Sequence, residues 1–183
     1  KPNMMPFNSI FLFTFLTFTS ISFTQEKKEE LLDWSTINRL TWDDYKGTPD
    51  PDSDAAASTT SYLGIEYDIS NYTVTYKIIC RFSKNKSWVA TKTDHILGHE
   101  QGHFDITEIF ARKLNKLTGQ YKFNKNTYQQ DLQKIYNDLQ HEKEEFQNKY
   151  DNETDFSRNK EQQTNWLKRI EKMLEDMRNY SDY

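Results

Sequence analysis

One stretch of five residues constrains this chain more than any other, because it places two histidines and a glutamate in the order His-Glu-x-x-His. These residues are His99, Glu100 and His103. Apolar residues recur around them at helical spacing, which predicts a helix over residues 93–117. The expected cap and the expected terminator of that helix are Asp94 and Gly119. Four further residues share the face of the two histidines: Ile96, Ile106, Phe110 and Leu114.

Residues four apart lie on the same face of a helix, so His99 and His103 are spaced to bind one Zn²⁺. Glu100 would lie beside the metal without being a ligand, in the position of a general base. A catalytic zinc lowers the pKa of its bound water to about 7. The motif therefore predicts a zinc-dependent hydrolase, in which Glu100 takes a proton from zinc-bound water. The competing interpretation is a structural helix whose histidines are ordinary, partly buried polar residues.

A catalytic zinc needs a third protein ligand, and the sequence leaves its identity open. The extended motif, with a third histidine six residues after the second, is excluded because Ile109 stands there and Ile106 replaces the required glycine. His141 lies in a charged, solvated run, and His95 is read as a residue of the helix start. A later acidic junction offers three carboxylates, which are either ligands or helix caps: Asp151, Glu153 and Asp155.

The order of predicted elements indicates an α+β fold, with N-terminal antiparallel strands packed on a helical C-terminal half. Two strands with a turn at 68–71 form a hairpin, at 58–69 and 72–82, and a short strand follows at 87–89. Two further helices are expected at 128–150 and 159–177. Cys80 falls on the buried face of the second strand and is read as a small apolar filler. Trp42 and Trp88 are read as core anchors.

The first 24 residues have the composition of an export signal. The run Pro6–Thr24 is uncharged and rich in Phe, and Ser22 and Thr24 suit cleavage before Gln25. An uncleaved membrane anchor is the alternative. Residues 25–183 then form one domain, secreted or periplasmic. A formal net charge of −4 with no basic block excludes nucleic acid as the expected partner, and a single cysteine excludes an internal disulfide.

Several strings, in this order, resemble a known bacterial family. The chain is similar to the family called domain of unknown function 922, whose members are labelled secreted zinc-dependent proteases. The resemblance spans nearly the whole chain after the signal segment, and it implies a zincin-like metal site on the helix. It rests on these markers: Leu40–Gly47, Ala56–Thr59, Ser87–Val89, His99–Ile106, Tyr150-Asp151-x-Glu153-Thr154 and Gln163-x-x-Trp166.

The chain departs from the family pattern where relatives carry a histidine two residues after Thr154, because Phe156 stands there. If that histidine is a ligand in relatives, this chain has lost it; if a carboxylate is the ligand, the site is intact. We take Glu153 as the third ligand, with Asp151 as the alternative. The expected function is a zinc metallopeptidase acting on a peptide or protein. The alternative is a catalytically weak or inactive zincin-fold protein that binds zinc or peptide in the cell envelope.

Overall fold

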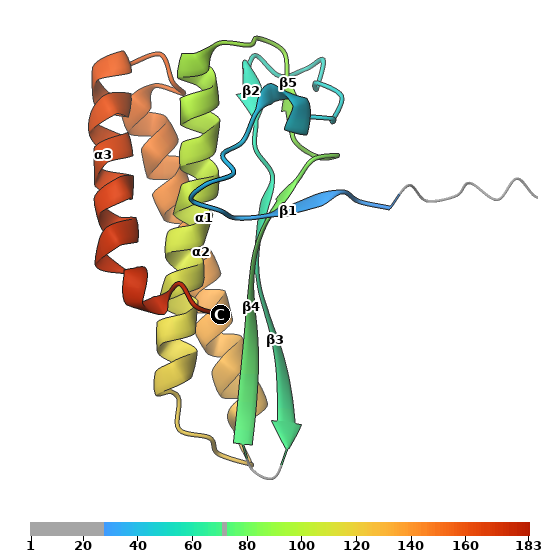
Figure 1. The fold of residues 1–183 in the computed structure, drawn as a ribbon, viewed down its shortest axis with the longest axis vertical. Helices are drawn as coiled ribbons and strands as arrows, with labels where there is room; N and C mark the ends of the chain where they lie inside the picture. Colours follow the sequence, from blue (N-terminus) through green and yellow to red (C-terminus); the bar gives the residue numbers. More distant parts are fainter. Residues whose placement is uncertain (1–27, 71–72) are drawn as a thin grey trace, which may run out of the picture.

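The structure, a computed structural model, describes residues 28–70 and 73–183 (Figure 1). Strands occupy the N-terminal half of the described chain and three helices the C-terminal half, so the predicted α+β class is confirmed. The predicted signal segment, residues 1–24, lies outside the described residues.

The strands form two antiparallel sheets. The larger sheet has the strand order β1-β4-β3, and the smaller one pairs β2 with β5. The strands of the larger sheet are β1 (Leu31–Asp33), β3 (Ser61–Ser70) and β4 (Thr73–Ser83). The strands of the smaller sheet are β2 (Ala57–Ser58) and β5 (Trp88–Val89).

The predicted hairpin is confirmed by the pairing of β3 with β4 over their whole length. Leu63 lies opposite Cys80, and Ile65 lies opposite Ile78. Alternate side chains of β4 are buried, as period-2 spacing requires. Cys80 is only 4% exposed within this row, which agrees with its expected role as an apolar filler.

The single strand predicted at 58–69 is wrong in one respect, because the chain changes sheets within it. The Thr60 amide donates to Ser87 Oγ at 2.9 Å, and the Thr60 carbonyl accepts from the Ser83 amide at 2.9 Å. The Thr60 amide thus bonds to a side chain instead of a strand, and β2 ends at Ser58 while β3 begins at Ser61.

The helices are α1 (Asp94–Gln120), α2 (Tyr128–Thr154) and α3 (Lys160–Asp176), and two short 3-10 turns are η1 (Trp42–Asp44) and η2 (Arg178–Tyr180). Helix α1 is central, because α2 and α3 pack on one side of it and the β3–β4 hairpin on the other (Figure 1). Its cap is Thr93, whose hydroxyl accepts from the Ile96 amide at 3.1 Å, rather than the expected Asp94. Gly119 belongs to its last turn.

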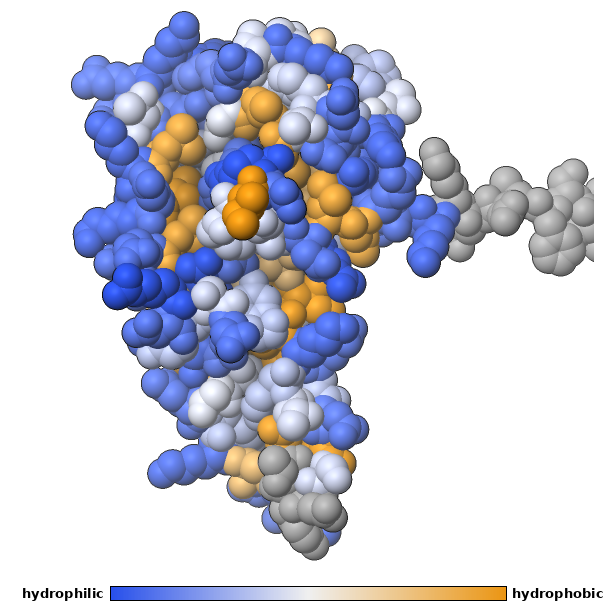
Figure 2. Space-filling view, in the orientation of Figure 1, coloured by the Kyte–Doolittle hydropathy of each residue, from blue (hydrophilic) through white to orange (hydrophobic). Residues whose placement is uncertain are grey.

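The core joins the hairpin to all three helices. Its fully buried side chains include Phe82 from β4, Ile106 and Phe110 from α1, Tyr150 from α2 and Ile170 from α3. Trp42 packs against this core as expected. Figure 2 shows a hydrophilic outer face on α3 beside an apolar strip, where α1 and α3 border a groove. Among the described residues, no helix combines the length and apolar character needed to cross a bilayer.

Helix α2 continues for four residues beyond its predicted end at Tyr150. It ends at Thr154, and the next residue, Asp155, takes the left-handed conformation at φ 48°. Phe156 and Ser157 follow at φ 50° and 72°. Non-glycine residues at positive φ are uncommon, and three in a row make this turn between α2 and α3 strained. The acidic junction of the sequence is therefore largely helix.

Candidate metal centre

The two histidines of the motif converge on one face of α1, as the spacing predicts. The Nε2 atoms of His99 and His103 are 3.2 Å apart. His99 is buried at 4% exposure. Two ring nitrogens at this distance, with their planes nearly perpendicular at 88°, point at a common position in front of the helix.

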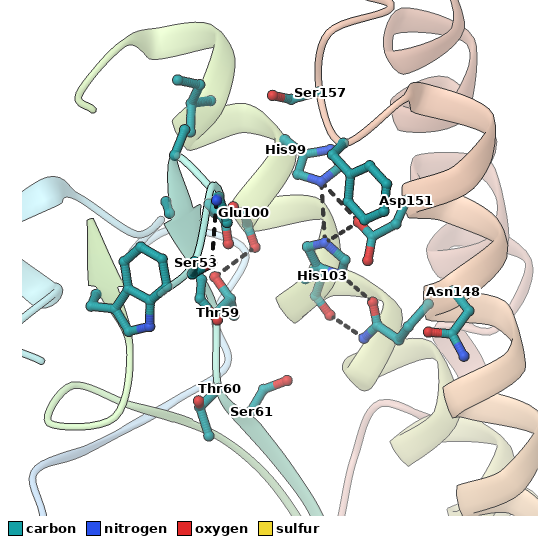
Figure 3. A pocket seen from close by; sticks show the side chains of 18 of the residues that line it. Ser53, Thr59, Thr60, Ser61, His99, Glu100, His103, Asn148, Asp151 and Ser157 are labelled. Atoms are coloured by element: carbon teal, nitrogen blue, oxygen red, sulfur yellow. Dashed lines mark hydrogen bonds and ion pairs between the residues drawn. The ribbon is translucent and has the colours of Figure 1, made fainter. Parts of the chain in front are cut away.

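Helix α2 brings a carboxylate to that position. Asp151 Oδ1 lies 3.1 Å from His99 Nε2 and 2.8 Å from His103 Nε2 (Figure 3). Within the described part of the chain, these three residues are the group that could hold a metal ion. Asp151 lies about fifty positions after the two histidines in the sequence, so only the packing of α1 on α2 assembles the group.

The three atoms fit the geometry of a zinc site. Around a tetrahedral Zn²⁺ with bonds of about 2.0–2.1 Å, neighbouring ligand atoms are separated by about 3.3 Å. The observed separations are 2.8, 3.1 and 3.2 Å. Two imidazole nitrogens and one carboxylate oxygen also form the ligand set of catalytic zinc, with a fourth position left for water or substrate. The residues present therefore fit the ion that the motif implies.

Gln147 fixes the tautomer of His103. The Gln147 side-chain amide donates through Nε2 to the His103 carbonyl oxygen at 2.9 Å, so its Oε1 faces His103 Nδ1 and accepts a hydrogen bond from it. Since Nδ1 then carries a proton, the Nε2 atom of neutral His103 keeps a lone pair for a metal ion, and a second proton on Nε2 makes the hydrogen bond to Asp151. An arrangement of this kind, in which an outer group orients a ligating histidine, is typical of metal sites.

The charges within the cluster are coupled. Burial alone would raise the pKa of Asp151, but hydrogen bonds from His103 and His99 outweigh it and hold that pKa well below its usual value. Burial lowers the pKa of His99. Burial also disfavours the charged form of His103. The hydrogen bond to Asp151 and the charge of that carboxylate outweigh burial and raise the pKa of His103. The site thus holds an ionised carboxylate that attracts positive charge.

Tyr150 packs against both histidines and explains the glycine of the motif. Its ring stacks on His99 with centroids 4.5 Å apart, and meets the ring of His103 edge-on at 5.0 Å. Its hydroxyl donates to the His99 carbonyl oxygen at 3.2 Å. A Cβ at Gly102 would lie 2.5 Å from that hydroxyl oxygen. Gly102 therefore permits the close approach of α2 that brings Asp151 to the histidines.

Glu100 lies in the same cleft, beside the cluster rather than in it (Figure 3). It is buried at 4% exposure, and its Oε2 has no hydrogen-bond donor among the described residues. Its backbone carbonyl accepts from the Thr59 hydroxyl at 3.4 Å, which ties α1 to the segment after β2. A buried carboxylate oxygen with an open acceptor position is suited to receive a proton from a water molecule in the cleft.

The cleft that contains the cluster has a volume of about 880 Å³. Helices α1 and α2 form one side, and residues 53–61, which include β2, form the other. Trp88 also lines it, so this tryptophan is not the core anchor that the sequence suggested. Phe156 lines it too and is 56% exposed.

The preferred third ligand of the sequence analysis, Glu153, is not part of the cluster. Its Oε2 accepts from Trp166 Nε1 at 2.8 Å, and its Oε1 lies 3.7 Å from Lys149 Nζ. The reason is the extra turn of α2. Residues two positions apart on a helix are about 200° apart around its axis, so when Asp151 faces α1, Glu153 faces α3. The structure therefore groups the alternative, Asp151, and not Glu153, with the two histidines.

The other candidates lie outside the cluster. Asp155 is exposed and 3.5 Å from Arg158. His141 is exposed beside Glu145, in agreement with its expected surface position. His95 contacts the Ser157 carbonyl oxygen at 2.5 Å. Asp105 accepts hydrogen bonds from Trp34 and Arg39 and so has a structural role. Sequence reasoning assigned no role to Gln147, although its spacing of four residues before Asp151 places both on one face of α2.

The family comparison covers this entire site. Residues 24–158 match the profile of a family described as bacterial protein of unknown function (DUF922). The chain belongs to this family. The match includes His99, Glu100, His103 and Asp151 and ends before α3. The resemblance seen in the sequence is thus confirmed at the level of the family. No curated protein and no solved structure is significantly similar to the chain.

Proposed function

We propose that this protein is a zinc-dependent metallopeptidase. The observation that carries the proposal is the convergence of His99 Nε2, His103 Nε2 and Asp151 Oδ1 within 3.2 Å of one another. These residues would hold the ion. When bound, zinc would lower the pKa of a coordinated water and polarise the carbonyl to be cleaved.

Glu100 is the proposed general base. Its buried side chain opens to the cleft beside the histidines, and one of its oxygens has no donor among the described residues. It would accept the proton of the attacking water and deliver it to the leaving amine. Glu100 lies one residue after His99 and three before His103, so its side chain leaves α1 at the border of the face that carries the two histidines and not from within that face.

The shape of the cleft supports an extended peptide as the substrate. Strand β2 lines the cleft and pairs on one edge with β5, and no second strand of the described chain pairs with it. A free strand edge binds extended peptides through main-chain hydrogen bonds. The segment that contains β2 faces the histidines across the cleft, so a peptide on this edge would lie next to the cluster (Figure 3).

Substitution of Glu100 tests the proposal. Glu100→Gln should keep about one zinc per chain by elemental analysis, while hydrolysis of a broad peptide library falls by roughly 10²–10⁴-fold. Glu145→Gln is the matched control, because Glu145 is an exposed residue of α2 outside the cleft. Wild-type protein that binds zinc and cleaves nothing would instead support a catalytically inactive zinc- or peptide-binding protein.

Export remains a prediction from the sequence. The family is bacterial, which suits a secreted or periplasmic address for a peptidase. The mature protein should begin near Gln25 and carry no membrane-bound segment. Intact-mass analysis of protein from the medium or periplasm checks this, and a membrane-bound product that retains residues 4–24 would favour the anchor.

A further inference from the structure

The far end of the cleft contains a lysine that the proposed chemistry does not use. Lys143 lies on α2, one turn before Gln147 and two turns before Asp151, so all three share a face of that helix. It lines the cleft together with Ser61. Eight residues of helix place Lys143 about 12 Å along the axis from Asp151.

Lys143 is a partly buried cation that forms no ion pair with any described residue. The other two lysines of α2 each pair with an acid one turn away: Lys134 with Asp138 at 2.6 Å, and Lys149 with Glu153 at 3.7 Å. Among the described residues, no carboxylate oxygen lies within 4 Å of Lys143 Nζ. Burial lowers the pKa of the Lys143 ammonium, and the charge of the adjacent Glu144 counteracts this shift.

Ser61 and Gln147 line the cleft together with Lys143, and so does the adjacent Glu144, whose carboxylate lies beyond 4 Å of Lys143 Nζ. Ser61 Oγ and Thr107 Oγ1 are 2.7 Å apart, and Gln147 Nε2 lies 3.4 Å from Thr107 Oγ1. These groups satisfy one another's hydrogen bonds. Because an unpaired charge in a partly buried position costs free energy, an anion that enters the cleft would be stabilised there.

We propose that Lys143 is a specificity residue that binds a carboxylate of the substrate. The distance of about 12 Å corresponds to roughly two to four residues of extended peptide, once the reach of the lysine side chain is included. The preferred substrate therefore carries an acidic side chain, or a free C-terminal carboxylate, at that distance from the cleaved bond. This inference rests on the proposed peptidase function.

The test uses zinc-loaded, full-length protein and peptides that differ at one position. Glu, Gln or Lys is placed at each position up to four residues from the cleaved bond, and the C-terminus is a free acid or an amide. The free-acid arm distinguishes a C-terminal carboxylate from a side-chain carboxylate. We expect Lys143→Met to lower kcat/KM for the preferred acidic peptide roughly 10- to 100-fold and to leave the Gln peptide unchanged. Lys143→Glu should favour the Lys peptide.

Lys149→Met is the matched control, because it removes the same charge from the same helix outside the cleft. Melting curves of all variants establish that they are folded. Equal kcat/KM for Glu and Gln peptides with wild-type protein would overturn the assignment and leave the peptidase proposal standing. An equal loss in Lys149→Met would also overturn it.

A binding measurement separates the two proposals. Fluorescence anisotropy of the same peptides is measured on Glu100→Gln protein, with and without Lys143→Met. If the acidic peptide binds more tightly than the neutral one and Lys143→Met abolishes the difference, the specificity role of Lys143 is supported. This holds even if wild-type protein cleaves nothing, and then only the peptidase proposal fails. Absence of any difference between acidic and neutral peptides in both assays would refute the role of Lys143.

Discussion

Replacement of Asp151 by Asn should weaken zinc binding without disturbing the helices that carry the site. Asn has nearly the shape of Asp, so the packing of α2 on α1 through Tyr150 and Gly102 is preserved. The change removes the negative charge that lies 3.1 and 2.8 Å from the two histidine nitrogens. It therefore tests the ligand and not the fold.

The expected magnitude follows from the number of ligands. Structural zinc sites with four protein ligands bind with about 10–16 kcal/mol at neutral pH, which is roughly 3 kcal/mol per ligand. Loss of the carboxylate should then raise the Kd for zinc about 100-fold, since 1.4 kcal/mol corresponds to about a factor of ten. Competition with a chromophoric chelator at constant pH measures this change.

Glu153→Gln provides the comparison. It removes the same charge from the same helix two residues later, and its amide oxygen can still accept the hydrogen bond from Trp166. We expect its Kd for zinc to stay within about twofold of wild type. The reasoning is refuted if Asp151→Asn binds zinc as tightly as wild type, or if Glu153→Gln is the variant that loses it.

Three further changes test the structure around the site. Gly102→Ala should lower the free energy of unfolding by roughly 1–3 kcal/mol in urea titrations, because its Cβ would lie 2.5 Å from the Tyr150 hydroxyl on α2. Gly119→Ala is the control and should be neutral or stabilising, because a Cβ there would have no atom within 4 Å. Gln147→Leu should weaken zinc binding about 10- to 100-fold in the chelator assay, because it removes the acceptor at His103 Nδ1; unchanged affinity would contradict the orienting role. Arg112→Met should lower the free energy of unfolding by about 3–5 kcal/mol, because it removes the ion-pair partner of Glu108, whose side chain is 2% exposed. A loss below about 1 kcal/mol would show that the Arg112–Glu108 pair is dispensable.

Local periodicity was enough to predict the features that lie within single elements. Spacing of four residues placed His99 and His103 on one face of α1, and alternation placed Cys80 on the buried face of β4. Both patterns follow from the geometry of one helix or one strand, so neither depends on what packs against it. The class of the fold and half of the candidate site could therefore be predicted from the sequence.

The end of α2 could not be predicted in the same way. The acids after Tyr150 resemble caps, and no proline or glycine follows to mark a later end. In the structure the Thr154 hydroxyl bonds to the Tyr150 carbonyl oxygen at 2.7 Å within the helix, and a non-glycine residue, Asp155, supplies the left-handed end. One additional turn decides the site, because it determines which acid faces α1.

The sequence by itself determined the helix, the pair of histidines and the glutamate between them. Only the tertiary structure decided that Asp151 completes the group and that Glu153 bonds to Trp166 instead. The physical reason is the approach of α2 to α1 at Gly102, where Tyr150 packs against both histidines. That contact joins residues about fifty positions apart, and no periodicity within either helix encodes its rotation.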